Sequence, residues 1–267
     1  RHALSPRGAR PEPPAMRLAD ARLLSFDCYG TLIDWELGIT TTVARLAGAH
    51  GVHPRAEEIL ALFAAHETLV QDAHPTWSYP TILAETWRRM AASMGLPSPA
   101  TAAERGEADA RAFAASVPEW PAFADSHDAL VDLAARCRLV ILSNVDRASF
   151  EGSRARLDVR FDAVITAQDV GSYKPDPANF RALLARAAEM GAGRDAHLHV
   201  AQSLYHDHVP AKAAGLATVR IDRYGATRAA AGGAVGAAGA TPAAAPVTPD
   251  WTYPSLRAFA DALLVDD

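Results

Sequence analysis

Four polar residues lie at or shortly after the ends of short apolar segments in this sequence. They are Asp27 after residues 23–26, Ser143 after 139–142, Lys174 in the loop after 163–166, and Asp207 after 198–201. Segments of this kind predict buried parallel strands. Because ligands bind at the carboxyl ends of such strands, we expect the four side chains to converge in one polar site.

Lys174 is notable because the chain contains only one other lysine, Lys212, and otherwise uses arginine. An ammonium is a compact point charge, whereas a guanidinium is a planar fork, so we interpret Lys174 as a charge placed within the site. Taken singly, the other three candidates also have ordinary structural explanations. Asp27 precedes a Gly-Thr turn, and Ser143 and Asp207 are suited to capping the helices that follow them.

The elements around these residues predict an α/β fold, with a Rossmann-like parallel sheet and helices on both faces. From residue 118 onwards, short apolar runs alternate with amphipathic helical patterns, as expected for such a sheet. The predicted strands are 23–26, 139–142, 163–166, 198–201 and 218–221, and the predicted helices are 126–136, 179–190 and 256–264.

Between the first and second strands, the pattern is helical throughout. Residues 37–117 carry apolar side chains at helical spacing over 41–50, 56–71, 79–94 and 102–116, with Gly and Pro between them. We therefore expect a helical cap domain at 37–117, inserted into a core domain formed by 21–36 and 118–267. Residues 1–20 are expected to form a disordered tail, and the Ala/Gly/Pro-rich residues 226–248 a flexible insertion.

Composition argues against several classes of protein. The chain has 267 residues and a formal net charge of −5, which does not favour binding to nucleic acids or anionic membranes. No apolar run approaches the length of a membrane helix. Two cysteines, Cys28 and Cys137, exclude a disulfide scaffold and suit the cytoplasm, which is the location we expect.

Four sequence blocks, in order, resemble the haloacid dehalogenase superfamily. They are FDCYGTLID at 26–34, LSNVD at 142–146, SYKPDP at 172–177 and HVAQSLYHDHVPAKAAG at 199–215. The resemblance implies that Asp27 is a nucleophile at the end of the first strand. It also implies that residues 37–117 are the family's helical cap.

Two departures from the phosphatase members of that superfamily favour dehalogenation. Phosphatases carry an acid two residues after the nucleophile, where this chain has Tyr29, and a Gly-Asp pair where it has Ala201-Gln202. Loss of a carboxylate weakens a Mg²⁺ site, and loss of the acid removes the proton for an alkoxide leaving group. A halide needs no such proton. Tyr29 and the position of Asp207 resemble type II L-2-haloacid dehalogenases, so we expect no metal ion and no cofactor.

The resemblance implies a covalent mechanism on a small anionic substrate, a 2-haloalkanoic acid. Asp27 displaces the halide, and water then hydrolyses the aspartyl ester to release a 2-hydroxy acid. Lys174 keeps the nucleophile ionised, and Asp207 pairs with Lys174 and positions the water. The residues implied to hold the nucleophile or the substrate are Tyr29, Thr31, Ser143 and Asn144.

The arginine that grips the departing halide in the family has no counterpart in this chain, where residues 60–70 read LALFAAHETLV. We expect Trp35 and His66 to line the site, and Trp77 and Tyr79 are further candidates for halide stabilisation. The family's Tyr, Ser and Asn elsewhere in the site are replaced by Phe180, Gln202 and Leu204.

Other functions remain open from the sequence. A hydrolase could open another C–N or C–O bond alpha to a carboxylate, such as that of a strained ring amine. A Mg²⁺-dependent phosphatase and a non-catalytic binding protein are further alternatives. His197, His199, His206 and His208 raise the question of a zinc site, but nothing in their spacing makes three or four of them converge. The resemblance also makes a homodimer possible.

Overall fold

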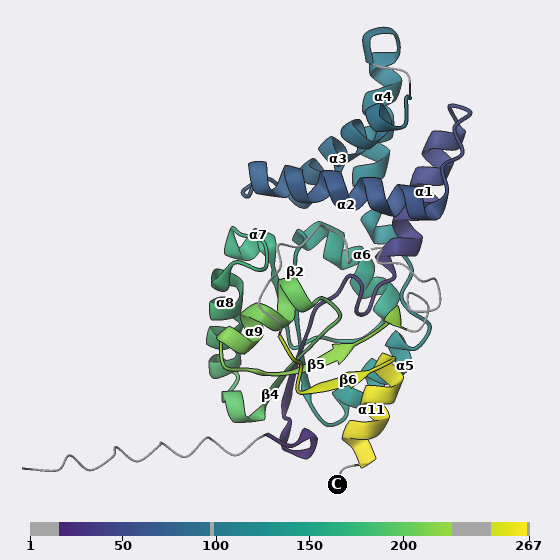
Figure 1. Cartoon of the computed structure of the whole chain (residues 1–267). Helices are drawn as coiled ribbons and strands as arrows, with labels where there is room; N and C mark the ends of the chain where they lie inside the picture. Colours follow the sequence, from purple (N-terminus) through teal and green to yellow (C-terminus); the bar gives the residue numbers. More distant parts are fainter. Residues whose placement is uncertain (1–15, 97–98, 226–246, 266–267) are drawn as a thin grey trace, which may run out of the picture.

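The computed structural model describes residues 16–96, 99–225 and 247–265. Its centre is a six-stranded parallel sheet in the order β3-β2-β1-β4-β5-β6 (Figure 1). The strands are β1 (Leu23–Phe26), β2 (Arg138–Ser143), β3 (Ala163–Thr166), β4 (His197–Ala201), β5 (Ala217–Ile221) and β6 (Trp251–Tyr253). Because β1 lies between β2 and β4, the residue after β1 is at the middle of the carboxyl edge.

Both faces of the sheet are buried, so its central strands are mostly apolar runs rather than alternating apolar and polar residues. On one face, Leu23 packs with β2 and β3 residues against α8 (Pro177–Glu189) and α9 (Val209–Ala213). On the other, Leu24 packs with residues of three further helices. These are α5 (Ser126–Ala134), α6 (Arg147–Leu157) and α11 (Leu256–Val265). The short α7 (Ala167–Val170) follows β3.

Four further helices lie above the carboxyl edge of the sheet (Figure 1). They are α1 (Trp35–Gly48), α2 (Ala56–Ala73), α3 (Tyr79–Ser93) and α4 (Pro99–Ala114), and we call them the α1–α4 bundle. Asp34 caps the N-terminus of α1, the first helix of this bundle: its side chain accepts a hydrogen bond from the backbone N–H of Leu37 (3.1 Å). Phe63, Trp87 and Phe113 join α2, α3 and α4 through ring contacts.

The structure confirms the predicted parallel α/β sheet and each predicted strand and helix, with ends that differ by a few residues, and by six at the start of α1. Strand β6 and a turn at residues 18–20 are among the elements that the sequence did not predict. Strand β6 is only three residues long, which is too short to show a period in the sequence. Residues 18–20 were assigned to a disordered tail but form a 3₁₀ turn whose Leu18 is buried in the core. The remaining tail residues, 1–15, and residues 226–246 lie outside the described residues.

None of the described helices is both long enough and apolar enough to span a membrane.

Candidate active site

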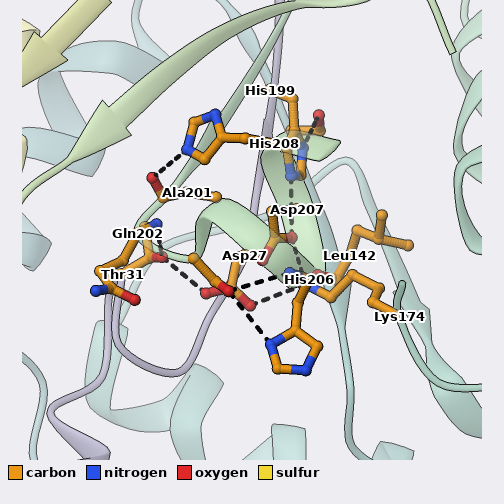
Figure 2. A network of polar contacts seen from close by, with 12 residues as sticks. Asp27, Thr31, Leu142, Lys174, His199, Ala201, Gln202, His206, Asp207 and His208 are labelled. Atoms are coloured by element: carbon orange, nitrogen blue, oxygen red, sulfur yellow. Dashed lines mark hydrogen bonds and ion pairs between the residues drawn. The ribbon is translucent and has the colours of Figure 1, made fainter. Parts of the chain in front are cut away.

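Three charged side chains meet at the carboxyl edge of the sheet (Figure 2). The Lys174 ammonium donates to Asp27 Oδ1 (2.9 Å), to Asp207 Oδ1 (2.6 Å) and to the carbonyl of Leu142 (2.9 Å). These three acceptors use all three N–H groups of the ammonium. Lys174 therefore holds the two carboxylates in place and has no N–H group left for direct contact with a substrate.

The charges of this triad depend on burial and on one another. Burial lowers the pKa of Lys174, but Asp207 and Asp27 outweigh it, so the net pKa is raised and the ammonium stays charged. Burial also opposes the ionisation of Asp207, yet Lys174 and His199 lower its pKa overall. For Asp27, burial raises the pKa, and the charge of Lys174 only partly offsets it. Asp27 is therefore the less readily ionised of the two carboxylates.

The loop after β1 holds the Asp27 side chain at the cavity. Its Oδ2 accepts a hydrogen bond from the Thr31 hydroxyl (2.7 Å), and that hydroxyl accepts one from the backbone N–H of Gln202 after β4 (3.0 Å). Gly30 has a φ of +95°, and a Cβ there would lie 3.0 Å from Trp35 Nε1, so this turn requires glycine. The Arg223 guanidinium donates twice to the carbonyl of Thr31 (2.8 and 3.1 Å) and secures the loop from β5.

Asn144 positions Lys174. Its side-chain carbonyl accepts from the backbone N–H of Lys174 (2.6 Å), and its amide donates to the carbonyl of Lys174 (3.0 Å). These two bonds tie the loop after β2 to the loop before α8. The Asn144 side chain thus supports the lysine through both of its polar atoms. Asn144 also lines the cavity.

A row of buried polar groups supports Asp207 from below. His199 Nε2 lies 3.1 Å from Asp207 Oδ1, and His199 Nδ1 lies 2.9 Å from the Ser25 hydroxyl. His197 Nε2 lies 2.8 Å from the same hydroxyl. Burial lowers the pKa of His197 to about 3, so this histidine is neutral at pH 7. His197 and His199 thus lie on the same face of β4, and both are buried supports.

A cavity of about 120 Å³ opens above the triad, between the sheet edge and the α1–α4 bundle. The sheet side contributes Asp27, Tyr29, Asn144, Val145, Lys174, Gln202, Ser203, His206 and Asp207, with Trp120 from the segment before α5. The bundle contributes Trp35, Phe63, Glu67, Gln71 and Tyr79. Among these lining residues, Lys174 is the only lysine or arginine.

Tyr29 and Trp35 line the cavity, as predicted. The Tyr29 hydroxyl lies 2.8 Å from the Ser153 hydroxyl of α6, and its ring meets Trp120 edge-on. Burial raises the pKa of Tyr29 well above its usual range. Tyr29 is therefore a neutral wall of the site, and it cannot replace the carboxylic acid that phosphatases carry at this position.

Three predicted side chains lie outside the cavity. Ser143 is buried, and its hydroxyl has no hydrogen-bond partner among the described residues; the side chain does not line the cavity. His66 lies on the side of α2 that meets α3, where Nε2 is 2.9 Å from the Ser93 hydroxyl, so its predicted place in the site is wrong. Trp77 stacks on His74 at 3.5 Å between ring centres and is also outside, whereas Tyr79 lines the cavity.

Sequence reasoning missed one titratable lining residue, Glu67. His206, which the sequence analysis considered as one of four histidines that could bind zinc, also lines the cavity. Burial lowers the pKa of His206, which keeps its ring neutral. Burial, with a contribution from the charge of Asp72, raises the pKa of Glu67 to about 7. Glu67 follows Phe63 by four residues, and this i, i+4 spacing is the signal that it shares the cavity face of α2.

The donor set does not fit a magnesium ion. Mg²⁺ prefers charged oxygen ligands in octahedral geometry. Here the inner oxygens of both Asp27 and Asp207 are bonded to the Lys174 ammonium, and Gln202 offers only a neutral amide. Within residues 16–96, 99–225 and 247–265, no cluster of three or more His, Cys, Asp or Glu side chains has the arrangement of a metal site.

The model of the family described as "haloacid dehalogenase-like hydrolase" matches residues 21–195, which include Asp27 and Lys174. The chain belongs to the haloacid dehalogenase-like hydrolase family. No curated protein matches it. The predicted superfamily is thus confirmed by a match that covers more than half of the chain.

Solved structures of this hydrolase family share the fold. The defluorinating L-2-haloacid dehalogenase Rha0230 is 21% identical, with a TM-score of 0.72 over 91% of this chain and 95% of that one. L-2-haloacid dehalogenase from Xanthobacter autotrophicus is 18% identical, with a TM-score of 0.72 over 92% and 100%. The putative HAD-hydrolase YfnB from Bacillus subtilis, bound to magnesium, is 14% identical, with a TM-score of 0.70 over 91% and 99%.

Proposed function

We propose that this hydrolase removes halide from small 2-haloalkanoic acids by a covalent, metal-independent route and releases 2-hydroxy acids. The observation that carries the proposal is the state of Asp27. Its carboxylate is held by Lys174 and Thr31 beneath a small cavity, and the neighbouring Tyr29 is a neutral, hydrogen-bonded wall. This set supplies a nucleophile, and Tyr29, at the position where phosphatases carry their acid, offers no carboxyl proton to an alkoxide leaving group.

In the first step, a carboxylate oxygen of Asp27 attacks the α-carbon, and the halide leaves with the electrons of the carbon–halogen bond. The Lys174 ammonium stabilises Asp27 as a carboxylate before attack. When the ester forms, Asp27 loses its charge, and Lys174 remains paired with Asp207. The ammonium therefore stays neutralised throughout, which avoids an unpaired buried charge.

In the second step, water attacks the carbonyl carbon of the Asp27 ester, and the 2-hydroxy acid leaves. Asp207 and the neutral ring of His206 both line the cavity beside Asp27 and are the groups suited to orient this water. The oxygen that remains on Asp27 comes from water, which gives the mechanism an isotopic signature.

The cavity walls suit a small, partly apolar substrate. Phe63, Trp35 and Trp120 provide apolar surface. The substrate carboxylate would then lie against the loop residues Asn144 and Val145, which also line the cavity. The α1–α4 bundle then acts as the cap that separates the reaction from bulk water.

Halide release from L- and D-2-chloropropionate and from chloroacetate, measured in EDTA, tests this proposal. A parallel panel of phosphate esters with Mg²⁺ tests the phosphatase alternative. Asp27→Asn should abolish halide release. Asp128→Asn, the same change on an exposed residue of α5, should leave it unaltered.

A single turnover in ¹⁸O-water should place one label in Asp27, detected by mass spectrometry of the peptide. Halide release that needs added metal, or label found only in the product, would refute the covalent, metal-independent route. Phosphate release with Mg²⁺ and no halide release would assign the phosphatase activity instead, and binding without turnover or label would indicate a non-catalytic protein.

A further inference from the structure

Glu67 is a carboxyl group on the wall of the cavity that faces the nucleophile. Phe63, Glu67 and Gln71 recur every four residues on α2 and form one strip of the cavity lining. Helix α2 lies above the carboxyl edge of the sheet (Figure 1). Asp27 follows β1 at that edge and lines the same cavity. The cavity is therefore bounded by a nucleophilic carboxylate on one side and a second carboxyl on the other.

The surroundings of Glu67 favour its protonated form. Burial, and then the charge of Asp72, raise its pKa to about 7. The other ionisable groups around it are Tyr79 of α3 and Tyr173 of the loop before α8, and burial raises the pKa of both phenols. The triad and His206 face it across the cavity, and the only lysine there is already bonded to both aspartates. The Gln71 amide donates to Glu67 Oε1, so the proton of the acid form belongs on Oε2.

The direction of the displacement gives this acid a task. In an in-line attack by Asp27, the leaving group departs on the side of the carbon opposite the nucleophile. That side is the α1–α4 bundle, where the lining residues are Trp35, Phe63, Glu67, Gln71 and Tyr79. A fixed cation would stabilise any halide there, but the bundle contributes none to the lining. A carboxylic acid instead favours a leaving group that accepts a proton.

We infer that Glu67 is a catalytic proton donor to the leaving group, and that the site takes 2-substituted carboxylates whose leaving group departs as a base, which among halides means fluoride. This inference rests on the proposed function. Bromide and chloride are very weak bases and gain little from the proton. Fluoride is the most basic halide and the strongest hydrogen-bond acceptor among the halides. A proton donor therefore accelerates the departure of fluoride from carbon more than that of chloride or bromide.

The steps balance. Asp27 forms a bond to the α-carbon, the carbon–fluorine bond breaks with its electron pair going to fluorine, and the Glu67 proton moves to fluoride to give HF and a Glu67 carboxylate. Water hydrolyses the ester to the 2-hydroxy acid and Asp27 carboxylic acid. The proton of that acid returns to Glu67. The sum is one fluoro acid and one water converted to one hydroxy acid and one HF.

The test compares fluoroacetate with bromoacetate as substrates of the full-length wild-type chain, Glu67→Gln and Glu57→Gln. Glutamine keeps the size of residue 67 and removes its transferable proton. Glu57 is an exposed residue at the start of the same helix, so its variant is the matched control. Fluoride and bromide release are measured as kcat/KM from pH 5 to 9.

We expect Glu67→Gln to lower kcat/KM for fluoroacetate about a hundredfold or more, and at least tenfold more than for bromoacetate. Glu57→Gln should not change the ratio between the two substrates. Because the acid form is needed, fluoride release by the wild type should fall as the pH rises through about 7. This alkaline limb should be absent in Glu67→Gln.

Equal losses on the two substrates, or an alkaline limb that persists in Glu67→Gln, would overturn the role of Glu67 and leave the proposed function intact. Bromide release without any fluoride release by the wild type would have the same meaning. Release of neither halide would overturn the proposed function, and the inference with it.

Discussion

Replacing Lys174 by methionine leaves two buried carboxylates without the cation between them. Asp27 Oδ1 and Asp207 Oδ1 lie 2.9 and 2.6 Å from the same nitrogen, so their separation is at most about 5.5 Å. Methionine has nearly the same length as lysine and no charge. The variant therefore tests the electrostatic role of Lys174 with little change in packing.

The size of the effect follows from Coulomb's law. In the wild type the Lys174 ammonium offsets the repulsion between the two carboxylates. In Lys174→Met this repulsion is uncompensated, and for two unit charges about 5.5 Å apart in a medium with an effective dielectric constant of about 20 it is about 3 kcal/mol. That energy lowers the ionisation of Asp27 at a given pH by about a hundredfold. Removing one partner of a buried ion pair also lowers the free energy of unfolding by about 3–5 kcal/mol.

The assay is the pH dependence of kcat/KM for chloroacetate, with urea unfolding at pH 7 as a second readout. The acid limb reports the ionisation of Asp27, whose pKa burial already raises. It should move to higher pH in Lys174→Met. In Lys174→Met/Asp207→Asn it should move back, because the repelling charge is gone, and part of the lost stability should return.

An unchanged acid limb in Lys174→Met would refute the electrostatic role of the lysine. An acid limb that moves in the single variant and does not return in the double variant would refute the coupling between Asp27 and Asp207. Loss of activity with unchanged stability in both variants would indicate that Lys174 acts on the substrate directly.

Two further predictions concern stability. In Gly38→Ala, the new Cβ would lie 2.3 Å from the buried Trp120 ring, so we expect urea unfolding to show a loss of about 1–3 kcal/mol. Gly106→Ala in α4, where a Cβ meets nothing within 4 Å, should instead gain about 0.5–1 kcal/mol, and equal effects of the two changes would contradict this account. Burial lowers the pKa of His197 to about 3 and of His208 to about 4, both below the unfolded value of about 6.5. The unfolded chain thus binds more protons, and the free energy of unfolding should fall by about 2 kcal/mol between pH 7 and pH 5.5; equal stability at the two values would show that these histidines are already charged.

The sequence by itself determined the sheet and the triad at its edge. Strands buried on both faces are mostly apolar runs, so a charged residue shortly after such a run indicates the strand end. Parallel strands place all these ends at one edge, which is why Asp27, Ser143, Lys174 and Asp207 were predicted to converge. Three of the four do so, and Ser143 does not line the cavity. The long helical stretch between the first two strands was equally readable from its period.

Only the tertiary structure decided which side chains of the bundle face the cavity. Neighbouring residues such as His66 and Glu67 point about 100° apart around a helix, and both fall near the apolar face of α2. The packing of α2 against α3 turns His66 towards Ser93 and leaves Glu67 on the wall of the cavity that Asp27 also lines. The period of a sequence fixes which residues share a face, whereas the neighbour that each part of that face meets depends on how the helices dock.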